Sequence, residues 1–339
     1  MKAVRFHSPG GPEVLTYEDI PEPVPGEGEA IVRVRACGVN RLDISLRSGK
    51  YKTQLPRILG TDVAGTVEQV GEGVKKVSPG DKVLVYPVIS DGTCRYCLEG
   101  KRNECVNVGL LGSVADGGYA ELLRINVDNL MRFEGVDFEV AASLPVNFAT
   151  AWNGLVNKAK VKADDVVLVW GASSGLGHAA IEIAKMHGAT VIATAGSDAK
   201  LRKAKELGAD YLINHASEDV AEKVKEYTDG LGASIVFDHV GSETWPKSLS
   251  SLRKNGILLS LGITTGSDTM VSIPQVYRNE LRVYGVYAFT YFELYNVLLL
   301  AIEKRLRPVI DSKFKLSDAK AAHQRIESRE HFGKILLIP

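Results

Sequence analysis

The stretch Val166–Lys185, VVLVWGASSGLGHAAIEIAK, constrains the fold more than any other part of the chain. Its first five residues are apolar and mostly β-branched, which is typical of a strand buried on both faces. A turn of small residues, Gly171–Gly177, follows, and apolar residues then recur at helical spacing. A strand, a glycine-rich turn and a helix in this order direct backbone N–H groups and the positive end of the helix dipole to one place. The stretch therefore predicts a cradle for a phosphate group.

The turn is a degenerate form of the dinucleotide-binding fingerprint G-x-G-x-x-G. Its three glycine places hold Ala172, Ser174 and Gly177. An ordinary strand-to-helix crossover that binds nothing is the alternative. The strand before the turn and the helix after it favour a nucleotide site, because the fingerprint is informative only in that context.

The pattern of the chain changes near residue 128. Residues 1–127 are rich in short strands and turns, which indicates a mostly antiparallel β domain. Over 128–287, strand-like runs alternate with helical stretches such as Ser217–Tyr227, which predicts a doubly wound parallel α/β sheet. Residues 288–339 leave this sheet, and we expect their final strand, Gly333–Ile338, to complete the first domain. The predicted strands of the parallel sheet are Val166–Trp170, Thr190–Ala195, Tyr211–Asn214, Ser234–His239, Ile257–Leu261 and Leu281–Ala288.

The composition limits the partners and the compartment that we expect. Forty-one basic residues balance 41 acidic ones, so charge does not indicate a nucleic-acid or anionic-membrane partner. No apolar run reaches membrane-spanning length. The segment MKAVRFHSPGG lacks the apolar centre of a signal peptide, and we therefore expect a cytoplasmic protein.

Three of the four cysteines form a cluster with an acidic residue. Asp91, Cys94, Cys97 and Cys105 follow the spacing D-x2-C-x2-C-x7-C. Such clustering argues for a metal site rather than for disulfides. Zinc accepts a carboxylate oxygen alongside thiolates, and four protein ligands close its coordination shell. We therefore predict one structural zinc ion, and a loop of free thiols is the alternative.

The end of the second strand of the parallel sheet bears on the choice of nicotinamide cofactor. A site that prefers NAD places Asp or Glu there to hold the ribose diol, whereas this chain has Ala195. Ser197 and Lys200 follow, and a hydroxyl and an ammonium group can both bind a 2′-phosphate. Asp198 lies at a similar distance and argues for NAD. We expect NADP(H). The alternative is that Asp198 points to solvent and Lys200 is a surface charge that binds no phosphate.

The chain resembles the medium-chain dehydrogenase/reductase superfamily, the fold of the zinc alcohol dehydrogenases, from end to end. The segments GPEVLTYEDIPEPVPGEGEAIVRVRACGVN, LGTDVAGTVEQVGEGV, AKELGADYLIN and GKILLIP carry this resemblance together with the glycine turn. Within the superfamily it is most similar to the NADPH quinone oxidoreductase branch, on the segments Gly38–Tyr51, Leu59–Gly65 and Ser143–Trp152. The resemblance implies a GroES-like catalytic domain joined to a Rossmann domain.

The resemblance also implies that one of two metal sites is missing. The places of the family's three catalytic zinc ligands hold Asn40, Thr61 and Pro145. An amide is a poor zinc ligand, threonine rarely serves, and proline has no side-chain donor. We therefore expect no catalytic zinc. The Asp91 cluster corresponds to the family's structural zinc loop, in which cysteine stands at all four places.

The resemblance implies a set of site residues. Asn40, Asp43, Tyr51, Thr61 and Thr150 are expected to face the nicotinamide, with Asn40, Tyr51 and Thr61 as catalytic candidates. Tyr51 is the first candidate for protonating or orienting a substrate oxygen, and a packing role is its alternative. His239 is expected to be a polar wall residue rather than an acid. The cofactor-binding set is Arg41, Thr150, Ser174, Gly175, Leu176, Gly177, Ser197, Lys200, His215, His239, Val240, Leu261, Gly262, Phe332 and Lys334.

These features favour an NADPH-dependent reductase. Without a Lewis acid, hydride transfer to an acceptor that is already electrophilic becomes the natural task, and quinones, activated enones and bulky aldehydes or ketones qualify. An enoyl-thioester reductase is a second hypothesis, and a non-catalytic NADPH-binding protein is a third. The apolar run Leu281–Phe289 at the end of the sheet, with the family's pairing of such strands, predicts a homodimer or a homotetramer.

Overall fold

The computed structural model describes all 339 residues, which form two compact units. The first unit comprises Met1–Val146 and Phe289–Pro339, and the second comprises Asn147–Ala288. The change of pattern in the sequence predicts the first boundary after residue 127. The first unit extends further because strand β10 (Leu130–Arg132) pairs with β6 (Lys82–Val85) of that unit.

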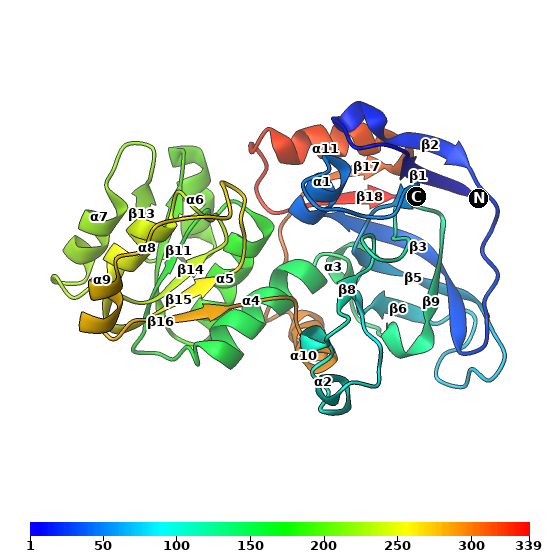
Figure 1. Cartoon of the computed structure of the whole chain (residues 1–339), viewed down its shortest axis with the longest axis horizontal. Coiled ribbons are helices and arrows are strands. Elements are labelled where there is room, and N and C mark those ends of the chain that lie inside the picture. Colours follow the sequence, from blue (N-terminus) through cyan, green and yellow to red (C-terminus); the bar gives the residue numbers. More distant parts are fainter. The chain divides into compact units, whose positions relative to one another are not determined.

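The second unit is a six-stranded parallel sheet with helices packed beside it (Figure 1). The strand order β13-β12-β11-β14-β15-β16 is that of the predicted doubly wound sheet and confirms this fold class. The strands are β11 (Val166–Val169), β12 (Thr190–Ala195), β13 (Tyr211–Asn214), β14 (Ala233–Asp238), β15 (Leu252–Ser260) and β16 (Arg282–Gly285). The helices are α4 (Thr150–Trp152), α5 (Gly175–Met186), α6 (Asp198–Glu206), α7 (Val220–Tyr227), α8 (Trp245–Ser251) and α9 (Ile273–Arg278).

Two elements of the second unit are shorter than predicted by more than one residue. Helix α7 begins at Val220 rather than near Ser217, because the Asp219 side chain accepts a hydrogen bond from the Glu222 N–H and caps the helix there. Strand β16 ends at Gly285, because its pairing with β15 covers only Arg282–Gly285. In contrast, the central strand β11 is buried along Val167–Val169, as its apolar sequence predicts.

The first unit contains the predicted β structure. Its main sheet runs β10-β6-β5-β3-β18-β17, with β9 (Leu122–Asn126) also paired to β3. The other strands of this sheet are β3 (Glu29–Val39), β5 (Asp62–Val70), β17 (Ile310–Lys315) and β18 (Lys334–Ile338). A small sheet joins β1 (Lys2–Phe6), β2 (Thr16–Asp19) and β4 (Arg57–Ile58), and β7 (Val88–Ile89) pairs with β8 (Gly109–Leu110).

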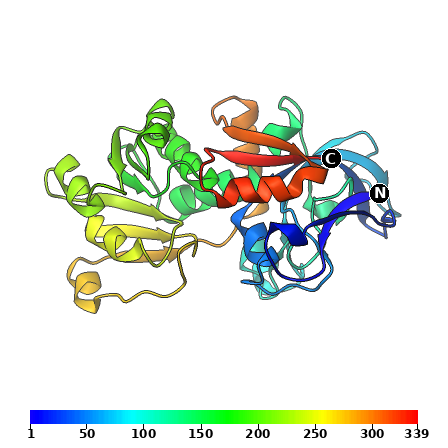
Figure 2. The same cartoon turned by 90° about the horizontal axis from the view of Figure 1, so that it is seen from above.

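The final strand returns to the first unit as predicted. Strand β18 pairs antiparallel with β3, with Leu336 opposite Gly38, and parallel with β17. Helix α11 (Ala319–Glu327) packs along β17 and β18, as both views show (Figures 1 and 2). The remaining α-helices of this unit are α1 (Arg41–Arg47), α2 (Arg95–Leu98), α3 (Phe138–Ala141) and α10 (Tyr291–Ile302).

None of the helices combines the length and the apolarity that crossing a lipid bilayer requires.

Candidate functional site

The glycine-rich turn of the second unit, which the sequence predicts to be a phosphate cradle, packs closely against the N-terminus of α5. Ser174 caps helix α5, and its Oγ accepts a hydrogen bond of 2.8 Å from the Gly177 N–H. A Cβ atom at position 177 would lie only 2.2 Å from the Gly171 carbonyl oxygen, so the third glycine place of the fingerprint admits no side chain. The turn therefore leaves the N-terminus of α5 closely packed and capped at the carboxyl end of β11.

His239 holds this turn from the next strand. Its Nε2 lies 2.9 Å from the Trp170 carbonyl oxygen and 3.0 Å from Ser174 Oγ. Because a carbonyl oxygen only accepts, Nε2 carries the proton. Burial lowers the pKa of His239 below its ordinary value, so the ring is neutral at pH 7. Such a ring is a fixed polar wall beside the turn.

A buried carboxylate fixes the loop that follows His239. Asp238 accepts hydrogen bonds from the Val240 N–H (2.9 Å), the Gly241 N–H (3.2 Å) and Ser248 Oγ (2.7 Å). Ser248 Oγ in turn accepts a bond from Trp170 Nε1 at 2.8 Å. Every oxygen of this carboxylate is therefore satisfied, and Val240 is held at the carboxyl end of β14.

His215 lies against the end of β12 and is acted on by the charges of two lysines. Partial burial, and then the charges of Lys247 and Lys200, lower the pKa of His215. The ring of His215 lies with Nδ1 3.3 Å from Thr194 Oγ1. Asp198, which argued for NAD, accepts a hydrogen bond of 3.0 Å from Asn214 Nδ2. The carboxylate that could compete for a ribose diol is thus bound to a neighbouring side chain.

A buried ion pair lies at the ends of three strands of the first unit. Lys334, which is 2% exposed, donates from Nζ to Asn40 Oδ1 (2.7 Å) and to Asp62 Oδ2 (2.5 Å). Asn40 Nδ2 donates to the same Asp62 oxygen at 2.9 Å. The other Asp62 oxygen accepts the Val146 N–H at 3.0 Å. The Lys334–Asp62 pair therefore links residues at or beside the three positions, Asn40, Thr61 and Pro145, at which the resemblance predicts the missing zinc ligands.

A second buried network fixes the same region. Asp43 accepts hydrogen bonds from the Asn40 N–H (2.8 Å), the Gly60 N–H (3.1 Å) and Tyr119 Oη (3.2 Å). Burial raises the pKa of Asp43 to about 6, although the N–H groups of Asn40 and Gly60 favour its ionised form. Asp43 thus ties Asn40 to the residue that precedes Thr61.

The direction of the hydrogen bonds beyond Tyr119 is set by an arginine. Arg47 can only donate, so His323 Nδ1 at 3.2 Å accepts and Nε2 carries the proton. Burial, and then the charge of Arg47, lower the pKa of His323 to about 3, which keeps the ring neutral. His323 Nε2 lies 3.1 Å from Tyr119 Oη, which donates onward to Asp43. The chain of bonds is locked in one direction and positions Asp43.

The remaining predicted residues lie as follows. Thr61 is buried, and its Oγ1 donates to the Leu111 carbonyl at 3.0 Å. Tyr51 is 39% exposed in the loop after α1, and Arg41 donates to the Ile326 carbonyl at 2.8 Å. Phe332 is buried in the first unit next to β18. In the second unit, Thr150 begins α4, Ser197 precedes α6, and Leu261 and Gly262 follow β15.

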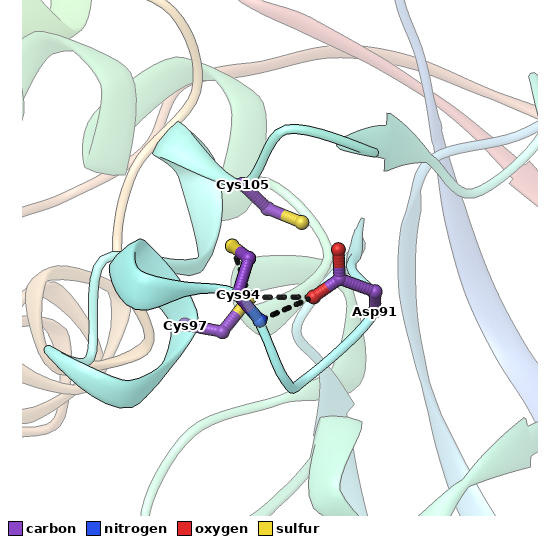
Figure 3. Close-up of side chains that lie close together, drawn as sticks. All are labelled: Asp91, Cys94, Cys97 and Cys105. Carbon is purple, nitrogen blue, oxygen red and sulfur yellow. Dashed lines mark hydrogen bonds between the residues drawn. The ribbon is translucent and has the colours of Figure 1, made fainter.

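The four predicted metal ligands come together in the first unit. Their ligand atoms all lie within 4.8 Å of one another, and the side chains of Asp91, Cys94, Cys97 and Cys105 point toward a common centre (Figure 3). The Cys94 and Cys97 sulfurs are 3.6 Å apart, and Cys97 Sγ is 3.5 Å from Asp91 Oδ1. A tetrahedral zinc with bonds of about 2.3 Å separates two sulfurs by about 3.8 Å. The donor set therefore fits zinc.

The loop is arranged so that Asp91 stays ionised. The N–H groups of Cys94 (3.0 Å) and Thr93 (2.9 Å) donate to Asp91 Oδ1, and Asn107 Nδ2 donates to Oδ2 at 3.0 Å. These bonds hold the pKa of Asp91 well below its ordinary value. An anionic oxygen is therefore available where the family has a fourth thiolate.

Sequence reasoning missed how Lys334 and Asp62 pair. The available signal was the lysine itself, which begins an otherwise apolar and buried strand, KILLI. A lysine is almost never fully buried unless it is paired. The roles of Tyr119 and His323 carried no local signal, because their contacts join distant parts of the chain.

The chain matches two family descriptions and many proteins of known type. "Alcohol dehydrogenase GroES-like domain" matches residues 26–135, and "Zinc-binding dehydrogenase" matches residues 175–303. Quinone oxidoreductase 1 of Escherichia coli is 33% identical over 99% of both chains. Acryloyl-coenzyme A reductase of Sulfurisphaera tokodaii is 31% identical over the whole of both chains. A crystal structure of an NAD-dependent alcohol dehydrogenase superposes with a TM-score of 0.96, at 38% identity over the whole of both chains. The chain therefore belongs to the medium-chain dehydrogenase/reductase superfamily of the zinc-type alcohol dehydrogenases and is an oxidoreductase of that superfamily.

Proposed function

We propose that the protein is an NADPH-dependent reductase that transfers hydride to a quinone, an activated enone or a bulky aldehyde or ketone without a catalytic zinc. The observation that carries this proposal is the Lys334 ammonium group, hydrogen-bonded to Asn40 and Asp62. A fixed positive charge repels a divalent cation at short range, and Asn40 Oδ1 is already engaged as an acceptor. The donor set at the places of the family's catalytic zinc ligands thus disfavours zinc.

The class of acceptor follows from the proposed absence of a catalytic zinc. The nicotinamide, when bound, supplies the hydride, and the acceptor takes a proton as well to complete a two-electron reduction. Without a Lewis acid to polarise a carbonyl, the acceptor must be electrophilic in its own right. The similarity to acryloyl-coenzyme A reductase favours an enoyl thioester as the second class of acceptor.

NADPH is proposed over NADH on the surroundings of β12. Lys200 and Lys247 both act on His215 electrostatically, whereas Asp198 is engaged by Asn214. Two ammonium groups near the end of this strand favour a 2′-phosphate over a free diol.

Steady-state oxidation of NADPH and NADH with quinones, enones, aldehydes and enoyl thioesters tests the proposed function. We expect kcat/KM for NADPH to exceed that for NADH at least tenfold. Lys200→Ala removes a charged phosphate contact of about 1–3 kcal/mol, so discrimination falls roughly 5- to 150-fold. Arg202→Ala on the same helix is the control and keeps the discrimination. Equal use of both cofactors would reject NADPH preference, and the absence of turnover with every acceptor would favour a binding protein.

We also propose that two copies associate through strand β16. This strand ends the sheet, and its Val283 is 42% exposed, while Tyr287 just beyond it is also exposed. Val286, by contrast, is buried within the chain. Light scattering at micromolar concentration should give a dimer or tetramer, and Val283→Asp should dissociate the β16 contact. Leu231→Asp, at an exposed apolar site elsewhere, is the control. A stable and active monomer would contradict the proposal.

A further inference from the structure

The side chain of Asn147 is a buried donor without a partner in the second unit. It lies in the short helical segment Pro145–Ala149, ahead of α4, and is 5% exposed. Its Nδ2 makes no hydrogen bond in the structure. A buried N–H group without a partner is costly, and native structures retain few of them. A ligand that accepts a hydrogen bond from this amide would remove that cost.

The position of this amide shows what kind of ligand it would meet. It packs against Gly175, the first residue of α5, and a Cβ atom at 175 would lie 2.2 Å from Asn147 Nδ2 and 2.6 Å from its Cγ. A side chain at position 175 would therefore displace the Asn147 amide. The N-terminus of α5 directs backbone N–H groups and a positive dipole end to the same place. A neutral donor beside these groups favours an anionic oxygen.

We propose that Asn147 Nδ2 donates a hydrogen bond to a pyrophosphate oxygen of the bound dinucleotide. This inference rests on the nucleotide-binding part of the proposed function and does not depend on which nicotinamide cofactor is used, because both contain the pyrophosphate. Asn147 is then a cofactor-binding residue outside the fingerprint, supplied by a segment that precedes β11.

Binding of NADPH and of adenosine 2′-monophosphate, which has no pyrophosphate, tests the proposal on the full-length protein. We expect Asn147→Ala to weaken NADPH binding about tenfold or more, because a hydrogen bond to a charged group contributes more than one between neutral groups. We expect the affinity for adenosine 2′-monophosphate to stay within about twofold of wild type. Asn279→Ala, whose amide already donates to the Gln275 carbonyl, is the matched control and leaves both affinities unchanged.

Two further measurements separate a ligand contact from a structural one. Removing an unsatisfied amide should leave the melting temperature of the cofactor-free protein unchanged or raise it, whereas loss of a structural contact would lower it. Gly175→Ala pushes against the Asn147 amide, so its effect on NADPH binding should be smaller in the Asn147→Ala background than in wild type.

Several results would overturn the proposal. They are an unchanged NADPH affinity in Asn147→Ala, an equal loss for adenosine 2′-monophosphate, a lower melting temperature of the cofactor-free variant, or additive effects of the two substitutions. If the wild-type protein prefers NADH, the same titrations with NADH and AMP test Asn147 independently of the NADPH preference.

Discussion

Lys334→Met is expected to destabilise the protein by about 3–5 kcal/mol, because it leaves the buried Asp62 carboxylate without its counter-ion. Asp62 is fully buried and lies 2.5 Å from the ammonium group, so no solvent screens the loss. Methionine nearly matches the lysine stem in volume, so the variant removes the charge with little change in packing. Denaturant unfolding at pH 7 measures the free energy of unfolding.

A surface ion pair on a neighbouring strand provides the control for this prediction. Lys313→Met, on neighbouring β17, breaks an exposed pair with Glu139 and should cost less than about 1 kcal/mol. Equal effects of the two substitutions would show that the buried pair contributes no more than a surface pair.

The other large effect that we expect follows from our prediction that the Asp91 cluster holds a zinc ion. Elemental analysis should find about one zinc per chain, and Cys94→Ser should abolish it. A ligand present at 1,000 times its Kd stabilises by about 4 kcal/mol, so the melting temperature should fall by roughly 10 °C. Turnover measured well below that temperature should be retained, because the four ligands leave no position for substrate.

The fourth cysteine provides the control for the zinc measurement. Cys37 is buried in the core of the first unit, away from the cluster, so Cys37→Ala should keep the zinc content. Two metal ions per chain would contradict our interpretation of Asn40, Thr61 and Pro145. Loss of turnover in Cys94→Ser without a change in melting temperature would contradict a structural role for the zinc.

The parts of the site that are built from residues close together in the sequence were predictable. The glycine turn and the D-x2-C-x2-C-x7-C loop each depend on residues close in sequence, where spacing fixes geometry. The parallel strands were predictable because burial on both faces leaves continuous apolar runs. Their ends were less predictable, since caps such as Asp219 and the pairing partner decide them.

The rest of the site depends on contacts that no local pattern encodes. Lys334 and Asp62 are 272 residues apart, and Tyr119 and His323 are 204 residues apart. Each residue taken alone has an ordinary interpretation, as a surface charge or a packed ring. Only the pairing of β18 with β3 brings the lysine to the strand ends beside Asn40 and Asp62. Asn147 was missed for the same reason, because its importance comes from Gly175 beside it.

The place of β18 in the first unit's sheet, between β3 and the edge strand β17, has a consequence for synthesis on the ribosome. The second unit is continuous in sequence and can fold as soon as residue 288 has emerged, but β3 waits for β18. At 5–20 residues per second, the delay between Val146 and Lys334 is on the order of ten seconds or more. During that time an unpaired strand edge and the Asp62 carboxylate lack their partners. The incomplete first unit is therefore most susceptible to chaperone binding and to aggregation during this interval of synthesis.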